Sequence, residues 1–228
     1  MGKRAENVSI IGGADGPTSI FLIGNKGKRK LKERIRGFFY EKKRQRVKKK
    51  ITANPHTLEE LTDYLKREYG ARELSKKSRA YQEQRKSMKE ALIVRYRPEL
   101  LGDLAQIRFP REELSGKGDF SREECKKALE EMWKKCEQRS RRAEEIPEDV
   151  FFMDFHIYEI RDSRGGRVQT GIETVWEQMG VSWSGNPKRK RQLNRVSRNI
   201  YLYYGVSEED IKNETERYDL LVTALSSY

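Results

Sequence analysis

The stretch FFMDFHIYEI, residues 151–160, is rich in aromatic and β-branched residues and contains neither glycine nor proline. This composition is typical of a strand that is buried on at least one face. Arg164-Gly165-Gly166-Arg167 then predicts a hairpin turn, after which residues 168–170 return as a second strand. The sequence therefore predicts a small antiparallel sheet in the C-terminal half of the chain.

Helical patterns surround this sheet. Thr57 and Glu60 form a capping box that opens one helix, and Ser207 with Asp210 starts the last helix. Apolar residues spaced three and four apart predict a further helix over residues 172–180. We therefore predict a mainly helical α+β fold, in which amphipathic helices pack on a small antiparallel sheet beside a basic N-terminal helical module.

The chain of 228 residues has room for one large or two small domains. Residues 108–119 lack periodicity and contain one proline and two glycines, so we predict a linker there. The predicted parts on either side of it are a glycine-rich, hairpin-like segment at 1–25, the basic helical module at 26–107 and an α+β domain at 120–228.

The charge of the chain is concentrated in one segment. Residues 26–50 hold fourteen Lys or Arg against only Glu33 and Glu41, and so carry +12 of the formal net charge of +13. The second half of this segment has no acid, and its basic residues are Lys42, Lys43, Arg44, Arg46, Lys48, Lys49 and Lys50. Solvated helices usually alternate in sign, so an unbroken run indicates contact with a polyanion.

Phosphate backbones are the commonest target of such a run, because bound cations release counterions from them. An anionic membrane surface is the competing partner. The apolar residues that share one helical face lie in the first half of the segment and are Leu31, Ile35, Phe38 and Phe39. We therefore expect the first half to dock on the protein and the second half to extend as a cationic rod.

A second basic face is predicted after residue 187. On a helical wheel Leu193, Val196, Ile200, Tyr203 and Tyr204 fall on the side that should pack, and the opposite side carries Lys188, Arg191, Arg195 and Arg198. Residues 176–182 faintly resemble the helix and turn of a helix-turn-helix motif. Asn186-Pro187 falls where its recognition helix should already have begun, which favours a generic phosphate-contacting helix.

Near the N-terminus stands IIGGADGPTSI, residues 10–20. This segment resembles the motif in the β subunit of the sodium-translocating decarboxylases, the oxaloacetate decarboxylase group of membrane pumps. The match covers about a twentieth of the chain. The resemblance implies that Asp15 takes part in sodium and proton coupling, while the backbone around it is shaped by Gly12, Gly13, Gly16 and Thr18.

The rest of the chain does not follow that family, whose members span the membrane many times. No stretch approaches the roughly 20 consecutive apolar residues of a spanning helix, and no secretory signal is evident, so we expect a soluble, cytoplasmic protein. Three explanations of the motif stay open: a borrowed fragment, a convergent glycine-rich turn, or an address read by a protein partner. As an alternative function, the motif implies a soluble accessory protein related to or associated with such a decarboxylase, not itself a transporter.

Acidic and histidine side chains gather on and after the predicted strand at Asp154, His156, Glu159 and Asp162. Asp154 and His156 point to one face and Glu159 to the other. A metal-dependent nuclease can use such carboxylates, whereas salt bridges to basic helices are the competing explanation. The sequence has no Ser/His/Asp, Cys/His or Walker pattern, so we predict no catalytic residue, no metal and no cofactor.

Cysteine usage adds one exclusion. Cys125 and Cys136 are eleven residues apart on one predicted amphipathic helix, about 16 Å along its axis, so they cannot form a disulfide with each other.

The function predicted from the sequence is binding of nucleic acid, RNA or DNA, or of another polyanion, mainly through phosphate contacts. A protein partner at the N-terminal motif belongs to the alternative.

Overall fold

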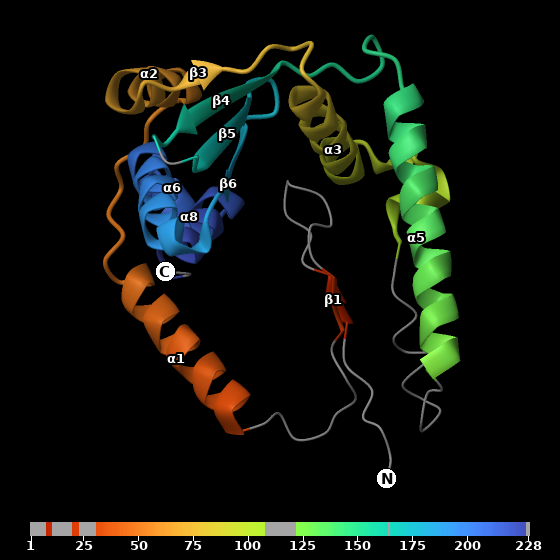
Figure 1. Ribbon diagram of the computed structural model, residues 1–228, viewed down its shortest axis with the longest axis horizontal. Coiled ribbons are helices and arrows are strands. Elements are labelled where there is room, and N and C mark those ends of the chain that lie inside the picture. Colours follow the sequence, from red (N-terminus) through yellow and green to blue (C-terminus); the bar gives the residue numbers. More distant parts are fainter. Residues whose placement is uncertain (1–7, 11–19, 23–30, 108–121, 164, 227–228) are drawn as a thin grey trace. The chain divides into compact units, whose positions relative to one another are not determined.

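The computed structural model (Figure 1) describes residues 8–10, 20–22, 31–107, 122–163 and 165–226. The chain forms two compact units, of which the first comprises residues 1–27 and 76–153 and the second residues 28–75 and 154–228. Both units join segments that are far apart in the sequence, whereas the sequence analysis divided the chain into consecutive domains. The predicted linker at 108–119 lies outside the described residues.

In the first unit, strands β1 (Val8–Ile10) and β2 (Ile20–Leu22) pair antiparallel, with Ser9 opposite Phe21. The strands agree with the predicted hairpin-like segment, while the residues between them lie outside the described part. Among the described residues of this unit, the helices are α3 (Arg79–Tyr96), η1 (Pro98–Leu100), η2 (Gly102–Ala105) and α5 (Arg122–Glu145). Helices α3 and α5 pack against each other (Figure 1).

A buried lysine ties α3 to α5. Lys89 is 5% exposed, and its Nζ donates to the backbone oxygens of Ile146 at 2.5 Å and Glu144 at 3.3 Å. Carbonyl groups at a helix C-terminus have no partner within the helix, so the ammonium group caps the end of α5. Burial lowers the pKa of Lys89.

Helix α5 also carries both cysteines, Cys125 and Cys136, which confirms the prediction that they lie on a single helix.

The second unit contains the predicted sheet. Its strands β3 (Arg72–Glu73), β4 (Phe155–Arg161), β5 (Arg167–Glu173) and β6 (Gln178–Ser184) pair antiparallel in this order. Helices α2 (Leu58–Tyr69) and α6 (Lys190–Tyr204) pack on one face of it, and the short η3 (Pro187–Arg189) precedes α6. The mainly helical α+β class predicted from the sequence is confirmed.

The main core lies between the sheet and these two helices. Its buried members include Leu61, Leu65, Tyr158, Val168, Ile172, Met179, Leu193, Ile200 and Tyr204. The predicted apolar side of α6 is confirmed, because Leu193, Ile200 and Tyr204 are at most 9% exposed. Ile172 sits opposite both His156 and Met179 in the strand register, which places all three on the face covered by the helices.

A second core forms where α8 (Glu216–Ser226) packs against both α6 and α1 (Leu31–Lys48). Its buried residues are Val206, Tyr218, Leu221, Val222 and Leu225. Between α6 and α8 lies the short helix α7 (Glu208–Asn213). The prediction of one last helix after Ser207 was wrong, since Glu214 adopts a left-handed conformation with φ of 45° that ends α7 before α8 begins.

The connection from α1 to α2 crosses the junction between α6 and α7. Backbone hydrogen bonds join Asn54 N to Val206 O at 2.9 Å and His56 N to Tyr204 O at 3.0 Å. The guanidinium of Arg217 donates to the carbonyl oxygens of Gly205, Tyr204 and His56, and lies 3.7 Å from the centre of the Tyr204 ring. This crossing fixes the segment that leads from the basic helix into the sheet domain.

The predicted capping box of Thr57 and Glu60 is confirmed, and Ser207 with Asp210, predicted to start a helix, forms a second one. Thr57 Oγ1 accepts from Glu60 N at 3.1 Å and Glu60 Oε2 from Thr57 N at 2.7 Å, and Ser207 and Asp210 exchange the same pair of bonds. Burial raises the pKa of Asp210, but hydrogen bonds from Thr215 and Ser207 outweigh burial and lower it overall. The stability that Asp210 contributes is therefore present above its pKa in the unfolded chain and is lost as the pH falls through the folded value.

Replacing Asp210 with asparagine is expected to lower the free energy of unfolding by about 1 kcal/mol near neutral pH. The difference from the unchanged protein should vanish in acid, where Asp210 is protonated in both the folded and the unfolded chain. Urea unfolding across a pH series measures this. Glu209→Gln is the control, because it removes the same charge from an exposed position in the first turn of α7. Equal pH profiles for the two variants would contradict the role of Asp210.

Candidate nucleic-acid interface

The second half of α1 docks on α8. Val47 and Ile51 are half-buried and pack against the second core. On the same side of the helix, Arg44 Nη2 lies 2.8 Å from Asp219 Oδ1, and Lys48 Nζ lies 2.7 Å from Glu214 Oε1. The hydrogen bond with Glu214 raises the pKa of Lys48. Two of the predicted nucleic-acid-binding residues are therefore paired within the protein.

The prediction that the first half of the basic segment docks and the second half extends was wrong. Phe38 and Phe39 are 56% and 64% exposed, so they do not pack on the protein as expected. The side chains of Leu31 and Ile35 lie outside the described part. The physical reason is that Asp219 and Glu214 supply counter-charges from a distant part of the chain, so a helix full of cations can still be held against α8.

The opposite side of α1 presents unpaired cations. At 100° per residue, Arg44 and Lys48 point to one side of the helix. Lys42 and Arg46 lie on the other side, and Lys49 and Lys50 follow in the turn directly after the end of α1; all four are exposed and are called the α1 stripe below. Among the residues that the structure describes, no acid lies within ion-pair distance of these four. The remaining basic residue of the run, Lys43, is half-buried.

A second set of exposed cations lies on α6 and on the short η3 before it. Arg191, Arg195 and Arg198 are exposed on the side of α6 away from the core, as predicted, Lys188 of η3 is exposed beside them in sequence, and the four are called the α6 face below. In the described part of the chain none of them pairs with an acid. Arg189 behaves differently: its Nε and Nη2 lie 3.0 and 2.6 Å from Asp162 Oδ2, so it stabilises the fold.

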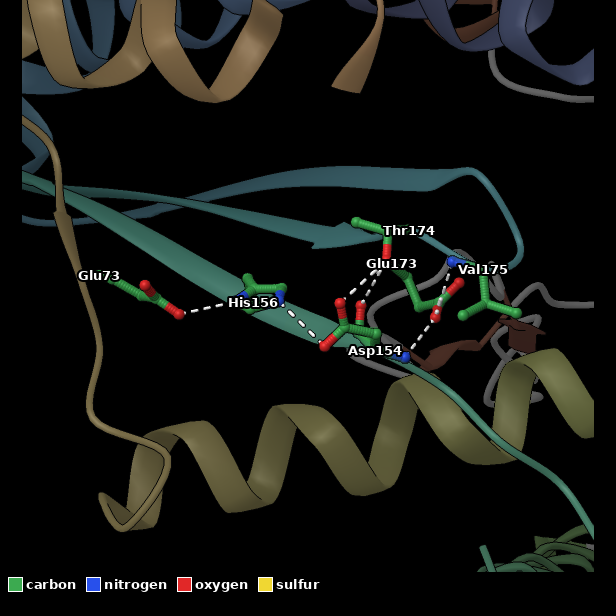
Figure 2. A network of polar contacts seen from close by, with 6 residues as sticks. All are labelled: Glu73, Asp154, His156, Glu173, Thr174 and Val175. Carbon is green, nitrogen blue, oxygen red and sulfur yellow. Dashed lines mark hydrogen bonds and ion pairs between the residues drawn. The ribbon is translucent and has the colours of Figure 1, made fainter. Parts of the chain in front are cut away.

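The helix-turn-helix interpretation was wrong, and so was the helix predicted over residues 172–180. Residues 174–177 form the turn of a hairpin, and β6 begins at Gln178. Figure 2 shows why the chain turns here: the fully buried Glu173 accepts hydrogen bonds from the backbone N–H groups of Asp154 at 2.8 Å and Val175 at 3.3 Å. Trp176 N donates to the same carboxylate at 2.5 Å.

Changing Glu173 to glutamine is expected to reduce the free energy of unfolding by about 2 kcal/mol. The amide keeps the size of the side chain but replaces one acceptor oxygen with a donor, which leaves a buried backbone N–H without a partner. Urea unfolding at neutral pH measures the loss. Glu177→Gln in the exposed part of the same turn is the control and should change stability by less than about 0.5 kcal/mol.

The acidic and histidine side chains on the sheet form a line of contacts (Figure 2). His156 Nδ1 lies 2.6 Å from Glu73 Oε1, and His156 Nε2 lies 3.0 Å from Asp154 Oδ1. The hydroxyl of Thr174 donates to Asp154 Oδ2 at 3.1 Å. Asp154 and His156 therefore share a face, as predicted. The imidazole of His156 in β4 thus connects Glu73 of β3 with Asp154, which immediately precedes β4.

The other acids of this group are structural. Glu159 is 5% exposed, and it accepts hydrogen bonds from Arg161 at 2.5 Å and Gln169 at 2.8 Å. Burial raises the pKa of Glu159, but these hydrogen bonds outweigh it and lower the pKa overall. Asp162 pairs with Arg189. A salt bridge to a basic helix is thus confirmed for Asp162, whereas Glu159 pairs with Arg161 of its own strand. Within the described ranges no group of three acidic, histidine or cysteine side chains can hold a metal ion.

Sequence reasoning missed Glu73 in this network. Residues 71–74 have an extended pattern, but nothing local shows that they pair with β4, where Glu73 sits opposite Tyr158. The motif residues Gly12, Gly13, Asp15, Gly16 and Thr18 lie outside the described residues, so the sodium-pump resemblance stays a prediction. None of the described helices is long and apolar enough to cross a membrane.

Comparison with known proteins gives no relative. The chain matches no protein-family model, and neither the curated proteins nor the solved structures contain a match to it. The two parts of the candidate site are the α1 stripe and the α6 face, which both belong to the second unit and whose helices both contact α8.

Proposed function

We propose that this protein binds nucleic acid, RNA or DNA, mainly through the phosphate backbone, and that it does so in the cytoplasm. The observation that carries the proposal is the division of cations on α1. Arg44 and Lys48 are used to dock the helix, while the four residues of the α1 stripe remain exposed with no acid beside them in the described part. A docked helix with an unpaired cationic side is a suitable surface for a polyanion.

The α6 face supports the same proposal. Its basic residues project from a helix whose other side is fixed in the main core, so their backbone positions are set by the fold. Phosphate contacts need only positive charge at defined positions and carry no sequence information. We therefore propose binding that depends little on base sequence.

Salt dependence tests the proposal. We expect the binding constant K for labelled RNA and DNA to decrease as the salt concentration rises. A plot of log K against the logarithm of the salt concentration should be linear, for duplexes and for single strands. If the α1 stripe alone meets four phosphates of a duplex, the slope is about −4, and contacts from the α6 face make it steeper. Fluorescence anisotropy across a salt series measures the slope.

A slope near zero, or no binding at low salt, would contradict nucleic-acid binding. The alternative implied by the N-terminal motif, an accessory protein of a sodium-translocating decarboxylase, predicts a different dependence. Asp15→Asn should leave nucleic-acid affinity unchanged under the present proposal. The alternative would be favoured if the function of the protein were lost in Asp15→Asn but kept when the charges of the α1 stripe are removed.

A further inference from the structure

Two aromatic rings lie beside the α1 stripe. Phe38 and Phe39 are 56% and 64% exposed, and their ring centres are 6.0 Å apart with the planes inclined by 70°. Lys42 Nζ lies 4.7 Å from the centre of the Phe38 ring. Two adjacent exposed rings beside exposed cations form an apolar patch with a polar rim, the arrangement that marks a contact surface.

The rings and the cations point to the same side of α1. At 100° per residue, Phe38 falls within about 40° of Lys42 and Lys49, and Phe39 within about 20° of Arg46. The docked residues Val47 and Lys48 fall on the other side. The surface therefore combines aromatic faces with positive charge along about three turns of one helix.

We propose that this surface binds single-stranded nucleic acid, with bases stacked on Phe38 and Phe39 and phosphates held by the α1 stripe. The inference rests on the proposed function and adds the form of the nucleic acid. In a duplex each base already stacks on its neighbours, so exposed rings gain nothing from it. Unpaired bases offer free π faces, and aromatic rings beside cations are the usual means of binding single strands.

An anionic membrane could also contact both cations and aromatic rings, through its charged surface and its hydrocarbon layer. The arrangement of cations and rings on α1 does not suit such a membrane. A helix that lies in a membrane interface buries one continuous apolar face and keeps its cations on the opposite side. On α1 the residues that follow Phe38 on its own side are Lys42, Arg46 and Lys49. Burying this side in lipid would carry three charges toward hydrocarbon, whereas a single strand places a phosphate near each of them.

The test compares strands that differ only in their bases. Three labelled probes of one length are used: a single-stranded oligonucleotide, an abasic strand with the same phosphates, and a duplex. The unchanged protein should bind the base-containing strand at least about tenfold more tightly than the abasic strand. In the variant with Phe38→Leu and Phe39→Leu this preference should be lost, while affinity for the abasic strand stays the same.

The variant with Phe38→Tyr and Phe39→Tyr is the matched control, and it should keep the preference because tyrosine retains an aromatic face. Equal affinity for the base-containing and abasic strands, with normal salt dependence, would overturn base stacking and leave the proposed phosphate binding intact. Absence of binding to all three probes at low salt would overturn both. The inference would be replaced by membrane binding if two results came together. The protein would bind vesicles of phosphatidylcholine with phosphatidylserine equally well with and without the Phe38→Leu and Phe39→Leu changes, and it would show no preference for the base-containing strand over the abasic strand.

Discussion

Replacing Lys42 and Arg46 with glutamine is expected to weaken binding to nucleic acid by about 50-fold at about 0.1 M salt. Both side chains are exposed and unpaired among the described residues, so each is free to neutralise a phosphate. Loss of two such contacts removes about 1.8 from the slope of log K against log salt for a duplex and about 1.4 for a single strand. The stability of the protein should be unchanged. Anisotropy titrations across a salt series and thermal unfolding measure the two quantities.

The matched control is the variant with Arg44→Gln and Lys48→Gln. It removes the same charge from the same helix, again one arginine and one lysine, but these side chains face Asp219 and Glu214. We expect its thermal unfolding midpoint to fall, because α1 loses its ionic contacts with α8, and its nucleic-acid affinity to change much less. If the two variants lose affinity equally, net charge rather than the α1 stripe controls binding, and the assignment of this surface is wrong.

Changing Gly205 to alanine is expected to lower the free energy of unfolding by about 3 kcal/mol or more. The residue has φ of +59° and ψ of −161°, a conformation that residues with a Cβ rarely adopt. An added Cβ would also lie 2.0 Å from Asn54 O and 2.9 Å from Asn54 C. Both atoms belong to the crossing between the α1–α2 connection and the α6–α7 junction, so relief of the clash would require that crossing to open.

Gly70→Ala separates strain from steric conflict. Gly70 ends α2 with φ of +60° and ψ of 31°, and a Cβ there would have nothing within 4 Å. This variant should cost only about 1 kcal/mol, the penalty for placing alanine in a left-handed conformation. Urea unfolding of both variants gives the comparison. A similar small loss for Gly205→Ala would show that the crossing is not tightly packed.

Local sequence chemistry predicted much of this fold. The helix starts at Thr57 and Ser207 form as expected because their partners are three residues away. The apolar side of α6 is likewise set by spacing within one helix. Spacing misled at residues 172–180, where apolar residues three and four apart suit a helix as well as a hairpin. Glu173 decides for the hairpin, because it accepts hydrogen bonds from backbone N–H groups of the turn and of Asp154, which immediately precedes the adjacent strand β4.

The candidate site was predictable only in part. Composition located the cations of both basic helices, but it could not separate Arg44 from Arg46, because the acid that pairs with Arg44 is Asp219 near the other end of the chain. The same holds for Phe38, which has the spacing of a docking face and is nevertheless exposed. Which side of a helix packs is decided by the partner, and α8 is too distant in sequence to be recognised.

The separation between α1 and its docking partner has a consequence during synthesis. Arg44 and Asp219 are 175 residues apart, so at about 5–20 residues per second the ribosome completes α8 between about 9 and 35 s after α1. Throughout that interval α1 cannot dock on α8, and Arg44 and Lys48 lack the two acids that pair with them in the folded protein. Asp219 and Glu214 thus leave α1 with exposed cations on one side, after a period in which the cations of its other side also lack their acidic partners.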